Sequence, residues 1–276
     1  MISRHTNNKQ PFPVGTRVLF EREFELAKTM VNFPLQPEIL RNSKFLEAIE
    51  SLEKLALEER FQPIAPRAIN DPRVNLYLEP LRKANEFYEI VLETNQVVEQ
   101  LTKPSPVIED THLARDADTA RLEGEAAQIT ADSHLAFVGS GPFPSTAIAL
   151  AKVFGCRVTC IDCSIEAIVL SARLLRRMGN LNIDVLWNFG EKVDYKQYTH
   201  VLIAALIHNR DVILQRISDS LALEGKVICR HGQGLQQLIY EGLDGKELNG
   251  FCNKGYVKDP KNTFTSIILS KTILKT

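Results

Sequence analysis

A glycine-rich turn is the first segment whose residue types point to chemistry. Gly139, Ser140 and Gly141 follow the apolar run 135–138, and Pro142 comes next, at the start of a stretch with helical character. The first glycine lets the chain turn tightly, the second lets a ligand approach the backbone, and the start of a helix offers N–H groups to an anion or carboxylate. The segment therefore predicts a ligand site, with a plain strand-to-helix turn as the alternative.

An acidic residue follows these glycines at the spacing seen in nucleotide sites, about 20 residues. Asp162 ends the apolar run 157–161, and a carboxylate at such a strand end accepts hydrogen bonds from ribose hydroxyls. The alternative is that Asp162 caps the helix expected to begin at Ser164. Because turn and acid occur together in the right order, we expect ribose binding. Pro144 replaces the third glycine of a dinucleotide fingerprint, which argues against a nicotinamide-dependent reductase.

Three cysteines have the spacing of an iron–sulfur site. Cys156, Cys160 and Cys163 form a Cys-x3-Cys-x2-Cys pattern. A strand over 157–161 would hold the first two about 13 Å apart, whereas the ligands of one cluster converge. We therefore expect small buried side chains and no metal. The six histidines show no metal-binding spacing either.

Composition narrows the class of protein. The chain has 276 residues, of which 44% are hydrophobic and 24% charged, and its net charge is −1. These are ordinary values for a globular chain, and without a basic surplus neither nucleic acid nor a membrane is an expected partner. The polar start of the chain has no signal-peptide core, and sparse cysteines fit a reducing compartment, so we expect a cytoplasmic location. A homodimer is compatible with these features.

Two parts of the chain must position these residues. Residues 1–130 are expected to form a helical N-terminal domain, because apolar positions recur at helical spacing over 37–59 and 72–101. Asp71-Pro72 supplies a cap and a first-turn proline to the second of these helices. A further helix is expected over 112–129.

Strands and helices alternate in the second part, residues 131–276, which predicts right-handed crossovers and a doubly wound parallel sheet. Expected strands are 135–138, 157–161, 183–186, 200–205 and 226–230, and expected helices are 142–154, 164–178, 209–221 and 234–240. The last two strands, 250–257 and 263–270, follow one another as a hairpin. The sequence thus predicts an α/β, Rossmann-like sheet of the class I methyltransferase type with a C-terminal antiparallel hairpin. The helical domain would be its lid, because ligands of such sheets sit beyond the carboxyl ends of the strands.

The segment 137–144, followed by Thr146, resembles the glycine loop of nicotianamine synthases. Weaker similarities follow in the family's order, over residues 70 to 270. They are Asp71-Pro72-Arg73-Val74-Asn75, Leu122-Glu123-x-Glu125, Ile203-Ala204-Ala205-Leu206, Val227-Ile228-Cys229-Arg230 and Ser266-Ile267-Ile268-Leu269. The chain departs from the family at Asn188, where an aspartate is usual.

The resemblance implies an S-adenosylmethionine-dependent transferase without a metal. Such enzymes direct an amine to the γ-methylene of the 3-amino-3-carboxypropyl (2-aminobutanoyl) group, and methylthioadenosine leaves. The compact helical part is more similar to the bacterial branch that modifies histidine in opine metallophore biosynthesis of the staphylopine and pseudopaline type, where an opine dehydrogenase acts next. Alternatives are self-condensation of S-adenosylmethionine as in nicotianamine synthesis, an ordinary small-molecule methyltransferase and a non-catalytic nucleotide-binding regulator.

The resemblance also implies roles for single residues. Glu123 is expected to orient or deprotonate the acceptor amine, with Glu125 as the fallback and an exposed helix position as the alternative. Arg230 is expected to hold a substrate carboxylate, and His208 to line the acceptor pocket, the alternatives being a surface arginine and an ordinary loop histidine. The expected S-adenosylmethionine-binding residues are Gly139, Ser140, Gly141, Pro142, Asp162, Asn188 on the adenine side, Ala204 and Ala205.

Overall fold

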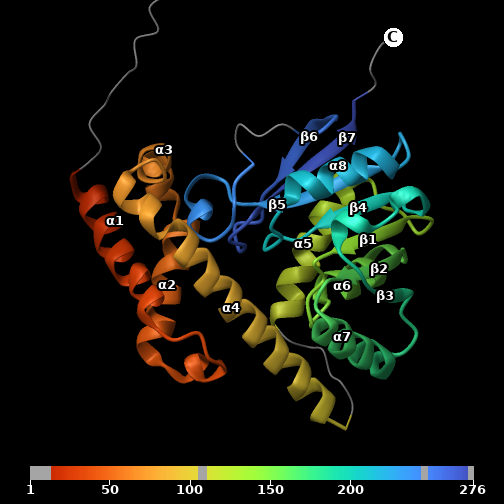
Figure 1. Ribbon diagram of the computed structural model, residues 1–276, viewed down its shortest axis with the longest axis horizontal. Helices are drawn as coiled ribbons and strands as arrows, with labels where there is room; N and C mark the ends of the chain where they lie inside the picture. The colour runs from red at the N-terminus through yellow and green to blue at the C-terminus, as the bar shows by residue number, and fades with distance from the viewer. Residues whose placement is uncertain (1–13, 105–110, 244–247, 273–276) are drawn as a thin grey trace, which may run out of the picture.

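A helical part lies beside a seven-stranded sheet in the computed structural model, which describes residues 14–104, 111–243 and 248–272 (Figure 1). The helical part contains α1 (Val14–Ala27), η1 (Lys28–Asn32), η2 (Pro37–Arg41), α2 (Ser43–Leu57), η3 (Glu59–Ile64), α3 (Ala65–Ala68) and the long α4 (Pro72–Thr102). Helix α5 (Thr111–Ala127) leads into the sheet. The expected helix over 72–101 is confirmed, and Asp71 caps it by accepting a hydrogen bond from the Arg73 amide.

The sheet has the order β3-β2-β1-β4-β5-β7-β6. Its strands are β1 (His134–Val138), β2 (Arg157–Asp162), β3 (Ile183–Trp187), β4 (His200–Ile203), β5 (Lys226–His231), β6 (Phe251–Val257) and β7 (Thr265–Lys271). The first five run parallel, and β7 pairs antiparallel with both β5 and β6. The predicted doubly wound sheet with its terminal hairpin is therefore confirmed.

Helices cover both faces of this sheet. They are α6 (Ser145–Phe154), α7 (Ile165–Met178) and α8 (Arg210–Ser220). Three short 3-10 turns lie in the connections between strands: η4 (Gly190–Lys192) and η5 (Tyr195–Gln197) before β4, and η6 (Gly234–Leu238) after β5. Alternate residues of β1 enter different cores: Leu135 and Phe137 pack with α5 and α6, whereas Ala136 and Val138 pack with α8. This alternation explains why the strand is apolar throughout.

Three predicted helices differ from the observed ones. The helix expected over 37–59 is interrupted at Asn42, whose side chain accepts from the Lys44 and Phe45 amides and starts α2. The helix expected from Pro142 begins three residues later, because Phe143 precedes a second proline and residues before proline avoid the helical region. The helix expected over 234–240 is the single 3-10 turn η6.

Helix α4 joins the two parts of the molecule, and Figure 1 shows it running obliquely between them. Its first half, with Val74 and Leu81, packs in the helical core, which also takes in residues of η6. Its second half places Val97 against α6 and α7. Helix α5 shares the core of the sheet, with Ala120 and Ala127 buried against β1 and α6. The domain boundary expected at residue 130 stays a prediction.

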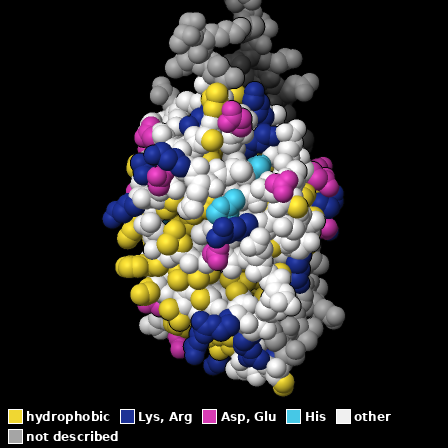
Figure 2. All heavy atoms as spheres, turned by 90° about the vertical axis from the view of Figure 1, so that its right-hand side faces the viewer, with side chains coloured by type: hydrophobic (Ala, Val, Ile, Leu, Met, Phe, Trp, Pro, Cys, Tyr) yellow, Lys and Arg dark blue, Asp and Glu magenta, His cyan; other side chains and the backbone are white. Residues whose placement is uncertain are grey.

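The sheet ends at β3 on one side, and this edge carries exposed apolar side chains. Leu186 and Trp187 of β3, and Ile165 and Val169 of α7, are all exposed. Figure 2 shows apolar side chains gathered on the lower part of this face.

None of the described helices is both long and apolar enough to cross a bilayer.

Candidate functional site

The glycine turn lies at the carboxyl end of β1, between the ends of two other strands. Gly139 and Gly141 have φ of +76° and +67°, which L side chains rarely adopt. The Gly141 amide donates to Asp162 Oδ2 at 2.9 Å, and the Ser164 amide donates to Oδ1 of the same carboxylate. The Asp162 carboxylate therefore fixes the turn, and its role toward a ribose stays a prediction. Helix α7 is capped by Ser164, whose hydroxyl accepts from the Ala167 amide.

A carboxylate from the helical part lies directly over this turn. A Cβ atom added to Gly141 would meet Glu93 Oε2 at 2.5 Å, and one added to Gly139 would meet Ile207 Cδ1 at 2.5 Å. The turn is thus a cradle whose floor is bare backbone and whose cover is a side chain of α4. A backbone surface without side chains, next to a carboxylate, fits a ligand that carries amine or sulfonium charge.

Helix α4 presents three acids toward the carboxyl ends of the strands. Glu86, Glu89 and Glu93 are spaced by three and four residues, so they share one helix face. Glu86 Oε2 lies 3.2 Å from His208 Nε2, and Glu89 Oε1 accepts from the Tyr240 hydroxyl at 2.7 Å. This row was not predicted, although three acids at helical spacing beside an apolar stripe indicate a shared helix face.

Glu123 and Arg230 form a buried ion pair. Glu123 is fully buried, and Arg230 Nε and Nη2 donate to its two oxygens at 2.9 and 2.8 Å. The pair is completed by Ser266, whose hydroxyl donates to Glu123 Oε1, and by Thr146, which accepts from Arg230 Nη1. The alternatives of an exposed helix glutamate and a surface arginine are therefore wrong. The carboxylate that the Arg230 fork holds in this arrangement is that of Glu123, and not one left open for a substrate.

The other predicted site residues divide between the same strand ends and the surface. Ala204 donates its amide to Val138 O at 3.0 Å, so the end of β4 lies beside the glycine turn. Asn188 uses its side-chain oxygen to accept from the Phe189 amide. Ser140 and Pro142 are buried within the turn. Glu125 is exposed and pairs with Arg121 of its own helix.

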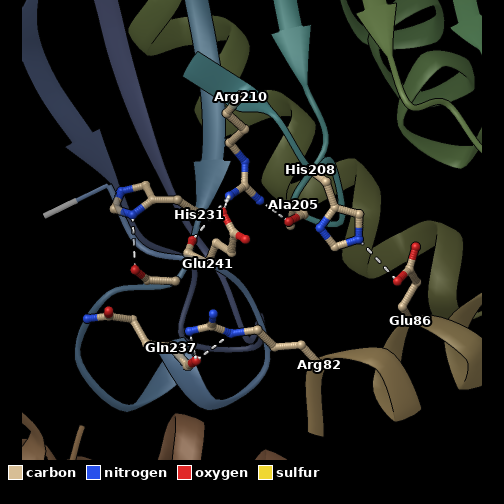
Figure 3. A network of polar contacts seen from close by, with 9 residues as sticks. Arg82, Glu86, Ala205, His208, Arg210, His231, Gln237 and Glu241 are labelled. Carbon is tan, nitrogen blue, oxygen red and sulfur yellow. Dashed lines mark hydrogen bonds and ion pairs between the residues drawn. The ribbon is translucent and has the colours of Figure 1, made fainter. Parts of the chain in front are cut away.

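A polar network lies past the ends of β4 and β5, shown in Figure 3. Arg82 of α4 donates from Nε and Nη2 to Gln237 O, at 2.9 and 2.6 Å. Arg210 donates to Ala205 O and, at 3.3 Å, to Glu241 O. Burial lowers the pKa of both guanidinium groups. His208, expected in the acceptor pocket, is exposed and borders this network through Glu86.

The three closely spaced cysteines lie in different environments. Cys156 and Cys160 are buried, whereas Cys163 is exposed. Burial raises the pKa of Cys156 to about 11 and that of Cys160 to about 12. Among the described residues, no group of three His, Cys, Asp or Glu side chains is arranged to hold a metal ion.

We expect iodoacetamide at about pH 8, near the ordinary pKa of a thiol, to label Cys163 long before Cys156 and Cys160, because the thiolate is the reactive form. Peptide mass spectrometry of the native protein checks this order, and labelling in urea is the control that all three sites are reachable. Equal native labelling of Cys160 and Cys163 would contradict the buried position of β2.

Comparisons with known proteins agree with this architecture. The family model described as "Nicotianamine synthase protein" matches residues 118–276. The L-histidine 2-aminobutanoyltransferase of Pseudomonas aeruginosa is 30% identical over 145 residues, which is 51% of this chain and 54% of that protein. The chain thus spans about half the length of the curated relatives that it matches first.

Two solved structures share the fold over nearly their whole length. A glutamate-to-glutamine mutant of MtNAS in complex with S-adenosylmethionine superimposes with a TM-score of 0.82 at 19% identity, covering 92% of this chain and 98% of that one. MtNAS in complex with MTA and tNA gives 0.78 at 19% identity, covering 94% and 97%. The sheet order, the glycine turn and the match of the family model over more than half of the sequence together establish that the chain belongs to the nicotianamine synthase family.

Proposed function

We propose that this protein transfers the 3-amino-3-carboxypropyl group of S-adenosylmethionine to the amine of an amino acid, histidine, and releases methylthioadenosine. One observation carries the proposal: the Glu93 carboxylate lies over the bare backbone of Gly141, at the carboxyl end of β1. The name of the bacterial relative supports the same transferred group and the same acceptor, and the MtNAS complex with S-adenosylmethionine supports the same donor.

The reaction requires one bond to form and one to break. The lone pair of the acceptor nitrogen attacks the γ-methylene of the donor, the bond from that carbon to sulfur breaks, and the electron pair stays on sulfur. The leaving thioether is neutral and needs no acid, whereas the attacking nitrogen must lose a proton to a base. The amine must also lie about 3–3.5 Å from the methylene and in line with the breaking bond.

Glu93 is our candidate for that base, because it is the acid nearest to the glycine turn on α4. Its carboxylate also favours the positive charge of the sulfonium before transfer and of the ammonium after it. We keep Asp162 as the ribose partner, with Asn188 and the exposed ring of Phe189 on the adenine side. Glu123 and Arg230 then serve as a buried pair that positions the end of β5.

The product would be a histidine that carries a new α-amino acid arm with a free primary amine. Such an amine is suited to condensation with a 2-oxo acid and reduction, the reaction of an opine dehydrogenase. We therefore place the protein before an enzyme of that class in metallophore biosynthesis.

Replacing Gly141 with alanine is expected to weaken S-adenosylmethionine binding by about tenfold, because the new methyl group would displace Glu93 and fill the cradle. The left-handed φ also costs about 1–2 kcal/mol of unfolding free energy. Calorimetric titration and urea unfolding measure the two effects separately.

Gly155→Ala is the matched control. Gly155 has nearly the same φ, +68°, and its added Cβ would make only an ordinary contact with Ala131. We expect this change to cost the part of the unfolding free energy that comes from the left-handed φ, about 1–2 kcal/mol, with unaltered donor binding. Equal donor binding by both variants would argue that the glycine turn is structural only.

The activity itself is tested by incubating the protein with S-adenosylmethionine and, separately, L-histidine, D-histidine or no acceptor. Chromatography with mass spectrometry should find methylthioadenosine and aminobutanoyl-histidine in equal amounts. Adenosylhomocysteine without methylthioadenosine would show a methyltransferase and overturn the proposal. Methylthioadenosine formed equally well without acceptor would indicate self-condensation, and donor binding without turnover on any amine would indicate a regulator.

A further inference from the structure

Arg210 is a buried cation whose hydrogen-bonding capacity is not filled by the described residues. Its residue is 2% exposed, and Nε has no hydrogen-bond partner among the described residues. Its nearest carboxylate is Glu241, whose Oε2 lies 4.0 Å from Nη1, at the limit of an ion pair. A buried charge is costly unless it is paired and hydrogen-bonded, so the position of Arg210 calls for a closer anion.

A second guanidinium faces the same space from the helical part. Arg82 reaches over from α4, and Figure 3 shows the two arginines on opposite sides of Glu241. Both line a small hollow with Glu86, His208, Ile239 and Tyr240. The charged or titratable groups lining it are therefore Arg82, Arg210, Glu241, Glu86, His208 and Tyr240, and of the two carboxylates Glu241 is the one whose charge acts on both guanidinium groups.

This hollow adjoins the donor cradle. Ile207 lines the hollow and also packs against Gly139 of the glycine turn. Helix α4 runs along both places, with Glu86 at the hollow and Glu93 at the turn, two helical turns or about 10 Å apart. The hollow has a volume of about 10 Å³, so only a small group such as a carboxylate would enter it, and that group would lie next to the proposed donor, on the side of β4.

We propose that Arg82 and Arg210 form the subsite that binds the α-carboxylate of the acceptor amino acid. Guanidinium groups bind carboxylates through paired, charge-assisted hydrogen bonds. The ligand's carboxylate would supply the close anionic partner that Arg210 lacks, since Glu241 Oε2 comes only within 4.0 Å of Arg210 Nη1. This inference rests on the proposed transfer, and it assigns to Arg82 and Arg210 the role that the sequence had suggested for Arg230.

The test compares acceptors with and without a carboxylate. For the unaltered protein we expect L-histidine to be used far better than histamine. Arg82→Gln should raise the KM for L-histidine by about ten- to a hundredfold, with the KM values for histamine and S-adenosylmethionine unchanged, because only the carboxylate loses a charged partner. Arg82→Lys should restore part of the preference. Arg210→Gln should also raise the KM for L-histidine. If that variant does not fold, the Arg82 variants alone test the subsite.

Arg216→Gln is the matched control, because Arg216 lies on the same helix as Arg210 and donates to a backbone oxygen, Val193 O, outside the hollow. It should leave both KM values unchanged. The inference is overturned if Arg82 variants keep the full preference for histidine. It is also overturned if they alter the preference for S-adenosylmethionine over its decarboxylated form, since the subsite would then hold the donor's carboxylate.

Failure of the proposed transfer gives a different result from failure of the subsite. If no acceptor yields methylthioadenosine, the proposed function is wrong. Calorimetric titration of L-histidine and histamine into protein saturated with methylthioadenosine then decides the subsite alone. Tighter binding of L-histidine that is lost in Arg82→Gln supports it, and equal or absent binding of both ligands overturns it.

Discussion

Glu93→Gln should lower the rate of methylthioadenosine formation by about 10²–10⁴-fold, the usual contribution of a general base. Glutamine keeps the length and shape of the side chain but cannot take the proton of the attacking amine. S-adenosylmethionine should still bind, because glutamine keeps the place of Glu93 over Gly141, but more weakly, because the negative charge that favours the sulfonium is lost. Single-turnover kinetics with L-histidine measure the chemical step, and calorimetric titration measures donor binding.

Glu99→Gln is the control on the same helix. Glu99 is exposed and pairs with Lys103 one turn on, so its replacement should change neither the rate nor donor binding. An unchanged rate for Glu93→Gln would remove the base from our mechanism. A loss of donor binding with an unchanged rate on bound donor would make Glu93 a residue that only holds the sulfonium.

The sheet could be predicted from the sequence because each of its signals is local. Short apolar runs, glycine or proline turns and helical stretches alternate from residue 131, and handed crossovers leave few ways to assemble them. Gly141 and Asp162 follow neighbouring strands, so their closeness at one edge of the sheet follows from the fold, whereas the hydrogen bond between them was not predicted. The helix boundaries that failed, at Asn42 and Pro142, depend on a side-chain cap and on two prolines whose effects compete with the apolar pattern.

The cover of the site could not be predicted in the same way. Glu93 lies 48 positions before Gly141, on a helix whose apolar stripe indicates only that one face is buried. The acidic row gains a role only because α4 lies across the carboxyl ends of the strands. That position results from packing between the two parts of the molecule. Arg82 and Arg210 line the same hollow for the same reason, and no sequence feature near either residue indicates that the other lies close to it.

Glu123 and Arg230 illustrate a further limit. The sequence suggested both, 107 positions apart, but gave each a separate role toward the substrate. The structure makes each the main partner of the other in a buried site. A resemblance can therefore select the residues that matter while leaving open whether they act on a ligand or on each other.

Removing one member of this pair should strongly destabilise the protein. Glu123→Gln takes from the buried Arg230 guanidinium the carboxylate that accepts from its Nε and Nη2, so the free energy of unfolding should fall by about 3–5 kcal/mol. Replacing both residues with apolar ones, Glu123→Leu with Arg230→Met, should recover much of this loss, because neither charge then remains unpaired. Urea unfolding of the two single variants and the double variant measures the coupling between them.

Glu125→Gln separates this effect from an ordinary loss of surface charge. Glu125 is two residues away on the same helix and pairs only at the surface, with Arg121, so its replacement should cost less than about 1 kcal/mol. If Glu123→Gln instead leaves unfolding unchanged and abolishes transfer, Glu123 is the base, as the family resemblance implies. Glu93 would then be left with holding the positive charge of the donor, so the two glutamine variants together decide which carboxylate receives the proton.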